Sequence, residues 1–275
     1  MSPRPNLRAW SVGGIHFKRL RSAGIAMTSF LGTLRERATR LVRRQDRPQD
    51  LKSINTLFVD IVKRCLPHEE AMQLAVGGSF EFVGGVELAL LKHYGLGAHD
   101  YLIDVGCGSG RLAVPLSRYL RGRYLGTDLV PDLIAHARKK AGRVDWRFEI
   151  IDNIHIPERD DVADMVCLYS VLTHLTHAQS FWYLEEAKRV LRPGGRIIFS
   201  FLEFREAGHM EAFWNSLKAT KNQFTEPMNV FMDRDGIQRW AEALGLDLID
   251  IRAGSDLIVP EGPLGQSLCV LSKPD

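Results

Sequence analysis

Short apolar runs and longer amphipathic stretches alternate along the middle of the chain. An apolar run of four to eight residues bounded by turn residues is typical of a buried strand, whereas apolar residues three or four positions apart are typical of a helix. The alternation predicts parallel strands joined by right-handed crossovers in a doubly wound α/β sheet. The predicted strands are residues 101–105, 124–128, 146–151, 162–169 and 196–202, and the predicted helices include 112–120, 131–141 and 178–191.

The alternation stops at residue 203. Residues 203–232 mix helical signals with polar, irregular sequence, and a helix is predicted after them at 233–244. Two further strands are predicted at 246–251 and 267–272, with no helical pattern between them. This arrangement predicts an antiparallel hairpin added to one edge of the sheet.

The strand at 101–105 ends in a glycine-rich turn, residues 106–110, that leads into a helix. Glycines let the backbone approach a ligand closely, and the helix N-terminus exposes N–H groups. A nucleotide-like molecule is therefore expected at this end of the strand. The dinucleotide fingerprint requires a glycine at the sixth position of the turn, where this chain has Arg111. Arg111 argues against an NAD-dependent oxidoreductase, which remains an alternative.

Two runs carry a family resemblance: DVGCGSG, which begins at Asp104, and LRPGGR, residues 191–196, before an apolar strand. Both resemble motifs of the class I S-adenosylmethionine-dependent methyltransferases. The resemblance implies S-adenosylmethionine as the cofactor and a Rossmann-like seven-stranded sheet, mostly parallel with an antiparallel C-terminal hairpin strand. It also implies that Asp104 helps to orient the methionine ammonium. The residues implied around the methionine end are Asp104, Gly106, Cys107 and Gly108.

Asp128 ends the second predicted strand, 20 positions after Gly108. A carboxylate can accept two hydrogen bonds from a vicinal diol, so Asp128 is expected to bind both ribose hydroxyls of an adenosyl group. The alternative is that Asp128 only caps the next helix, although Asp132 is better placed for that task. Leu129 is expected to pack on the adenine.

Asp152 and Asn153 follow the third predicted strand. In the family an acidic residue commonly stands here and accepts from the adenine amino group, while a neighbouring backbone N–H donates to the ring. Asp152 and Asn153 match these positions. A turn-forming Asp-Asn pair is the competing interpretation.

Residues 170–177 follow the fourth predicted strand and are similar to the family's segment at the mouth of the site. The resemblance implies that Ser170 contacts the cofactor and that His174 lies near the transferred methyl group. A histidine that is mostly neutral at pH 7 can take a proton from an acceptor hydroxyl, so His174 is the candidate catalytic residue. The alternative is a histidine that packs or caps a helix.

Residues 1–50 form a basic extension that is expected to be partly helical or disordered. Residues 1–52 contain twelve Lys/Arg and three Asp/Glu, a net charge of +9, which leaves −6 for the remainder. Residues 27–45 show an apolar stripe opposite arginines, and this pattern predicts weak attachment to an acidic membrane surface or a protein partner. The alternative is a helix packed on its own domain. The methyltransferase domain is expected at 51–275.

Two segments precede the first strand of that domain. Residues 51–66 show a helical pattern that ends at Pro67. Residues 77–85 are rich in glycine and, by the resemblance, are expected to fold over the methionine end of the cofactor as a lid. A simple helix-to-helix turn is the alternative. The helix that leads to the sheet is expected at 86–94.

Composition narrows the class of protein further. The chain is 45 % hydrophobic, yet no stretch approaches the roughly 18 uninterrupted apolar residues of a membrane helix. Its four cysteines are scattered, without a CxxC pair or a His/Cys cluster at zinc spacing, so no metal site is predicted. Free thiols and the lack of a secretion-signal core favour a cytoplasmic protein. The mildly acidic remainder argues against nucleic acid as the acceptor.

These interpretations converge on methyl transfer from S-adenosylmethionine to an O, N or C nucleophile of a small molecule. By the resemblance, residues 203–232 shape the acceptor pocket. The alternatives are an S-adenosylmethionine-binding scaffold or regulatory protein without transfer activity, and a protein or RNA methyltransferase. The candidate acceptor contacts are His209, Trp214, Asn229 and Phe231.

Overall fold

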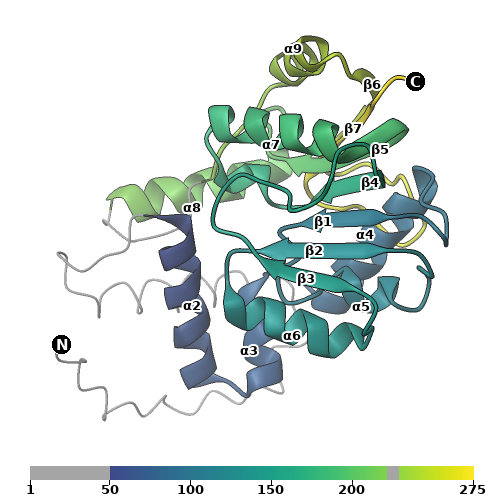
Figure 1. The fold of residues 1–275 in the computed structure, drawn as a ribbon. Coiled ribbons are helices and arrows are strands. Elements are labelled where there is room, and N and C mark those ends of the chain that lie inside the picture. Colours follow the sequence, from purple (N-terminus) through teal and green to yellow (C-terminus); the bar gives the residue numbers. More distant parts are fainter. Residues whose placement is uncertain (1–49, 222–228) are drawn as a thin grey trace.

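The computed structural model describes residues 50–221 and 229–275. A seven-stranded sheet in the order β3-β2-β1-β4-β5-β7-β6 forms its centre (Figure 1). Strand β7 runs antiparallel to both of its neighbours, and the other neighbouring strands pair in parallel. The strands are β1 (Leu102–Val105), β2 (Tyr124–Asp128), β3 (Arg147–Ile150), β4 (Ala163–Leu168), β5 (Leu191–Phe201), β6 (Asp247–Arg252) and β7 (Ser267–Ser272).

The predicted doubly wound sheet and its C-terminal hairpin are both confirmed. The β6–β7 hairpin joins the sheet at β5, with β7 as the inner strand and β6 at the edge. Helices connect the parallel strands, as right-handed crossovers require. The helices are α2 (Leu51–Cys65), α3 (His68–Ala75), α4 (Phe80–His93), α5 (Ala113–Leu116), α6 (Pro131–Ala141), α7 (His177–Val190), α8 (Met210–Lys221) and α9 (Arg234–Leu244), with 3₁₀ turns η3 (Leu172–His174) and η4 (Ala207–His209).

Apolar side chains form a separate core on each face of the sheet. One core packs α7 and α9 against the strands, and the other packs α4, α5 and α6 against the opposite face. A third, smaller cluster joins α2 and α3 to Val130 and Leu133 at the start of α6. In Figure 1, α2 and α3 stand beyond one end of strands β1–β3, on the same side as α8. This end of the sheet carries the candidate site.

Several boundaries differ from the prediction. Helix α5 ends at Leu116 rather than near Leu120, because the following residues form a turn in which the Tyr119 hydroxyl donates to the Leu96 carbonyl at 2.7 Å. Strand β5 begins at Leu191, five residues early, because Leu191 already pairs with Ala163 of β4. The predicted helix within residues 27–45 lies outside the described residues.

Helix α4 begins at Phe80, so most of the predicted lid segment 77–85 is helical. Gly84 explains why a glycine pair is tolerated there: a Cβ atom on Gly84 would lie 2.3 Å from the carbonyl oxygen of Arg111. The glycine therefore lets α4 pack directly against the chain that follows the glycine turn. Residues 76–79 form the helix-to-helix turn that was the alternative interpretation.

In the part of the chain that the structure describes, no single helix is long and apolar enough to cross a membrane. Helices α3 and α4 reach the required length and composition when they are taken together, but they are bent by 48° relative to one another.

Candidate functional site

Two adjoining cavities open at the carboxyl ends of β1, β2 and β4. The first has a volume of about 190 Å³ and the second of about 320 Å³. In open α/β sheets ligands bind in the crevice outside the carboxyl ends of the strands, which is the position of both cavities. The residues that line both are Asn55, Gly106, Asp128, Ser170 and His174.

The glycine turn forms the floor between the cavities. Gly106 and Gly108 have φ angles of 72° and 55°, a region that favours glycine. A Cβ atom on Gly106 would lie 2.4 Å from Cγ2 of Val171, and one on Gly108 would lie 2.5 Å from Cγ1 of Val76. Both the backbone conformation and the close packing therefore require glycine at these positions.

The Asp128 carboxylate closes the turn from the neighbouring strand. Its Oδ2 accepts a hydrogen bond from Gly108 N–H at 3.0 Å, and its Oδ1 accepts one from Val130 N–H at 2.9 Å. Burial raises the pKa of Asp128, and these backbone donors oppose that shift. The side chain does not cap α6, whose N-cap is Val130. Each oxygen can accept a second hydrogen bond, so the carboxylate can still receive a ligand diol.

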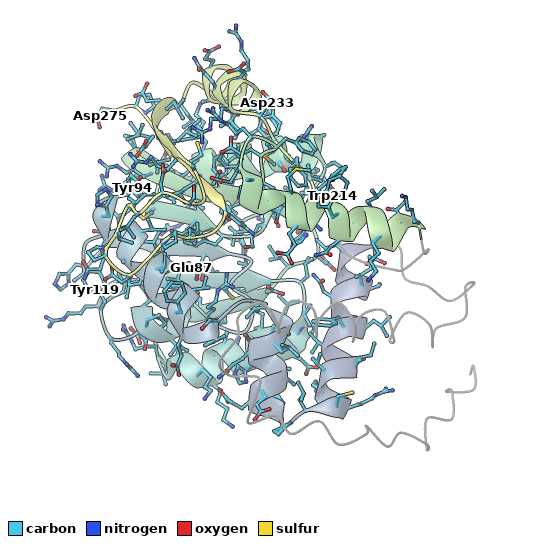
Figure 2. The ribbon with its side chains drawn as sticks, turned by 180° about the vertical axis from the view of Figure 1, so that it is seen from behind. Glu87, Tyr94, Tyr119, Trp214, Asp233 and Asp275 are labelled. Carbon is cyan, nitrogen blue, oxygen red and sulfur yellow. The ribbon has the colours of Figure 1, made fainter. Side chains whose placement is uncertain are left out.

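Buried charges line the first cavity. The Asp104 carboxylate accepts from the Tyr124 hydroxyl at 2.7 Å, and burial raises its pKa to about 7. Glu87, which comes from α4 inside the fold (Figure 2), is also buried, and burial raises its pKa. Arg111 donates to Glu87 through Nη2 at 2.6 Å and Nε at 3.3 Å. Two buried carboxyl groups and one guanidinium thus line the same cavity.

The second cavity contains the residues predicted to surround adenine. Leu129, Asp152 and Asn153 line its wall together with apolar Ile154 and Val171. The Asp152 carboxylate is 73 % exposed and lies 3.6 Å from the Lys52 ammonium of α2. The cavity therefore offers an apolar surface with an exposed carboxylate at its edge, a combination that suits a planar base with an amino group.

The turn after β4 presents Ser170 and His174 to both cavities. Ser170 has a φ angle of 57°, which is unusual for a residue with a side chain. Its backbone N–H donates to Ser200 Oγ of β5 at 2.7 Å, and Ser200 Oγ donates to Gln266 at 2.6 Å. Such a conformation persists only where surrounding contacts hold it, and these hydrogen bonds supply them. His174 ends η3 at the shared boundary of the cavities.

The structure brings all ten predicted site residues to these two cavities. Asp104, Cys107 and Gly108 line the first cavity, and Leu129, Asp152 and Asn153 line the second. The remaining four, Gly106, Asp128, Ser170 and His174, line both. Their individual roles stay predictions.

Sequence reasoning missed several residues that line the cavities, Glu87 and Asn55 among them, and misjudged Arg111. Glu87 was absent from the predicted site, although it is the only acidic residue in the apolar run 86–91, and a lone acid in such a run is a usable signal. Asn55 of α2 was also missed. In the sequence analysis Arg111 only argued against the dinucleotide fingerprint, whereas the structure shows that its side chain lines the first cavity.

The cover over the cavities is α2 rather than residues 77–85. Asn55, Phe58 and Val59 line the first cavity, and residues 50–52 line the second. From the predicted lid only Gly77 reaches the first cavity, beside Val76. Phe80 already starts α4, and none of residues 80–85 lines either cavity.

None of the four predicted acceptor contacts lines either cavity. His209 is buried, and its ring nitrogens contact Glu203 N and the carbonyl oxygen of Gly265, so it is a structural residue. Asn229 donates to Ser216 Oγ at 2.8 Å. Trp214 and Phe231 belong to an exposed aromatic group beyond the cavities.

Within residues 50–221 and 229–275, no group of three or more His, Cys, Asp or Glu side chains is arranged to hold a metal ion.

Comparisons with known proteins find methyltransferases. The family model described as "Methyltransferase domain" matches residues 103–199, from β1 into β5. Malonyl-[acyl-carrier protein] O-methyltransferase of Hahella chejuensis is 28 % identical over 151 residues, which cover 54 % of this chain and 52 % of that protein. Demethylmenaquinone methyltransferase of Deinococcus radiodurans is 36 % identical over 107 residues, 38 % of this chain and 42 % of that protein. The chain thus spans about half the length of these relatives.

A solved structure has a similar fold. Magnesium protoporphyrin IX methyltransferase from Synechocystis, solved with bound SAH (S-adenosylhomocysteine), superposes with a TM-score of 0.51 at 17 % identity. The superposition covers 90 % of this chain and 98 % of that one. Together with the DVGCGSG run and the strand order, the matched family model identifies residues 103–199 as a methyltransferase domain.

Proposed function

We propose that this protein transfers a methyl group from S-adenosylmethionine to a nucleophilic atom of a small molecule. The observation that carries the proposal is the charge in the first cavity. Glu87 and Asp104 are buried there with the single guanidinium of Arg111. Buried carboxylates are costly without a cationic partner, so a ligand that brings positive charge is favoured.

The cofactor complements this cavity group by group. Its amino-acid end carries an ammonium and a carboxylate, and its sulfonium is a further positive charge. Glu87 and Asp104 would accept from the ammonium, while Arg111, partly exposed to the cavity, would donate to the carboxylate. Asp128 would accept from the ribose hydroxyls, and Leu129, Asp152 and Asn153 would surround the adenine.

S-adenosylmethionine, when bound, supplies a methyl group already activated by the sulfonium. The chain's own residues then need to hold donor and acceptor in line and to exclude water. The α2 residues Asn55, Phe58 and Val59 close the first cavity and would keep water out. His174, at the boundary of both cavities, would take the proton from an acceptor hydroxyl through its imidazole.

The relatives support a small-molecule acceptor, since their names include a demethylmenaquinone methyltransferase. Charge supports it as well: residues 53–275 carry a net charge of −6, unlike the basic surface that binding of a polyanion requires. Free thiols at all four cysteines support a reducing, cytoplasmic setting. An S-adenosylmethionine-binding scaffold without transfer activity remains the alternative function.

Calorimetric titration of the full chain with SAH and, separately, with NAD tests the cofactor. We expect SAH to bind and NAD not to bind. Asp128→Ala should weaken SAH binding by about 1 to 3 kcal/mol, because the ribose diol loses its acceptor. The matched control is Asp132→Ala, an acid four residues away that pairs with Lys63 outside the cavities, and it should leave the SAH dissociation constant unchanged. Tight NAD binding without SAH binding would overturn the proposal.

A turnover assay distinguishes a methyltransferase from an S-adenosylmethionine-binding scaffold without transfer activity. SAH release from S-adenosylmethionine should depend on an added acceptor, and for a hydroxyl acceptor His174→Ala should lower kcat by about 10²- to 10⁴-fold. The same substitution should change the SAH dissociation constant little. A kcat unaffected by His174→Ala would remove the histidine from the chemistry while leaving methyl transfer intact.

A further inference from the structure

Four aromatic side chains outside the two cavities contact one another and form a cluster that we call the aromatic wall: Phe204, Phe213, Trp214 and Phe231. Phe204 is 60 % exposed and Trp214 is 55 % exposed. Trp214 stands on α8, well away from the buried Glu87 (Figure 2). Large apolar side chains that cluster at a surface mark a contact site more often than singly exposed ones do.

The rings of the aromatic wall are ordered with respect to one another. Phe204 stacks on Phe231 with ring centroids 4.3 Å apart and planes inclined by 16°. Phe213 meets both rings edge-on, at 5.6 Å from Phe204 and 6.2 Å from Phe231. Trp214 meets Phe213 edge-on at 5.1 Å. Phe204 remains 60 % exposed despite these contacts, so its side chain keeps surface for a further contact.

Buried polar contacts fix the backbone that carries Phe204. The preceding residue, Glu203, is buried and accepts from Arg234 Nε at 2.9 Å and Nη2 at 2.8 Å, and from Ser267 Oγ at 2.6 Å. Its backbone N–H donates to His209 Nδ1 at 2.9 Å. These contacts hold the backbone next to Phe204, while Phe213 and Phe231 contact its ring, and such preorganisation favours binding because less freedom is lost.

The aromatic wall is joined to the turn that carries His174. Val230 N–H donates to the Thr173 carbonyl oxygen at 2.8 Å, one residue before His174. Phe231 forms a parallel bridge with Leu202 at the end of β5, and its carbonyl oxygen lies 3.1 Å from His177 Nε2. The wall therefore continues the carboxyl edge of the sheet from the shared boundary of the two cavities.

We propose that the aromatic wall binds a planar, apolar ring of the methyl acceptor and that the acceptor belongs to the hydroxylated aromatic compounds. This inference rests on the proposed function, because it identifies the second substrate of the same site. Stacked and edge-on contacts favour a flat ring over an aliphatic group of equal size. The His174 imidazole would take the proton from a hydroxyl group on that ring, and the hydroxyl oxygen would receive the methyl group.

The test uses 1-naphthol as the probe and the full chain saturated with SAH, so that the cofactor cavities are filled. Equilibrium dialysis should show 1-naphthol binding more tightly than its saturated analogue, decahydro-1-naphthol. Phe204→Ala and Trp214→Ala should each weaken 1-naphthol binding by about five- to tenfold. The control is Trp182→Ala on α7, because Trp182 is equally exposed, at 53 %, and lies outside the aromatic wall; it should change nothing.

Several outcomes would overturn the inference. One is equal binding of the two probes, and another is unchanged 1-naphthol binding in both aromatic-wall variants. A dimer that Phe204→Ala converts to monomer would assign the surface to a second copy of the chain. If the wild-type protein sediments with phosphatidylcholine vesicles and both variants do not, the aromatic wall binds a lipid surface instead.

The SAH titration separates this inference from the proposed function. If SAH binds normally and the aromatic-wall variants behave as wild type, the methyltransferase proposal survives and the acceptor class is wrong. If SAH does not bind the wild-type chain, the proposed function fails first. Circular dichroism melting of each variant checks that the exposed substitutions leave the fold intact.

Discussion

The glycine-turn side of the crevice and the aromatic wall hold their functional groups at the same edge of the sheet by different means. On the glycine-turn side, Asp104 and Asp128 sit on two adjacent short strands paired in parallel, and Gly106 and Gly108 lie in the turn that follows the first of them. At the aromatic wall, Phe204 follows Glu203, whose partners Arg234 and Ser267 lie 31 and 64 residues further along the chain.

The comparison shows that local sequence can specify the geometry of the glycine turn, whereas the geometry of the aromatic wall depends on tertiary contacts. Backbone conformation and hydrogen bonds from the main chain dominate at the glycine turn, so a short motif carries most of the information. At the aromatic wall a buried ion pair sets the geometry, and no short motif records it. Substitutions should accordingly affect cofactor binding on the first side and ring binding on the second.

The largest effect is expected from Gly106→Ala. The left-handed backbone and the clash with Val171 should lower the free energy of unfolding by about 3 kcal/mol and weaken SAH binding more than about 100-fold. Chemical denaturation and calorimetry measure the two effects. Gly142→Ala is the control, because Gly142 has a similar φ of 63° with open space around it; it should cost about 1 kcal/mol and leave SAH binding intact.

Arg234→Ala tests the framework behind the aromatic wall. Removal of the guanidinium leaves Glu203 buried without its cation, and because Arg234 is itself partly exposed we expect a loss of about 2 kcal/mol in urea unfolding. Arg239→Ala, which breaks an ion pair on the same helix with Arg239 81 % exposed, should cost less than about 0.5 kcal/mol. Equal losses in the two variants would contradict the role of the buried pair.

The pH dependence of cofactor binding tests Asp104. Burial raises the pKa of this carboxyl to about 7, so it is largely protonated at pH 6 in the ligand-free protein and largely ionised at pH 8. A cationic ligand favours the ionised form. The affinity for S-adenosylmethionine should therefore rise about tenfold from pH 6 to pH 8.

Asp104→Asn should bind S-adenosylmethionine more weakly but with a flat pH profile. The stability of the ligand-free protein should change with pH in the opposite direction to the affinity. The pKa of Asp104 is higher in the folded than in the unfolded chain, so the wild type should lose stability as the pH rises from about 4 to about 7. An identical pH slope in wild type and Asp104→Asn would show that another group titrates.

The smallest effect is expected from Lys52→Ala at the second cavity. Both partners of the Lys52–Asp152 pair are exposed to solvent, and such pairs contribute little. The SAH dissociation constant should change by less than about twofold. A larger change would mean that Lys52 itself contacts the ligand.

Much of the fold followed from the sequence because the buried strands are apolar runs bounded by turns. Asp128 followed from its place at the end of the second strand, and the structure confirms that place. The apolar run 86–91 marks Glu87 as an unusual acid, but no local pattern records its pairing with Arg111, 24 residues away. His209 was misjudged for a similar reason: its partners, Glu203 and Gly265, are brought together only by folding.

The position of β7 has a consequence for the order in which this protein matures on the ribosome. Residues 267–272 form the inner strand on which β6 pairs, so β6 finds its neighbour only after residues 267–272 have been synthesised. Until then the β5 edge stays open and could recruit a strand from another nascent chain. The interval between the synthesis of β5 and the synthesis of β7 is therefore the time when chaperone protection matters most.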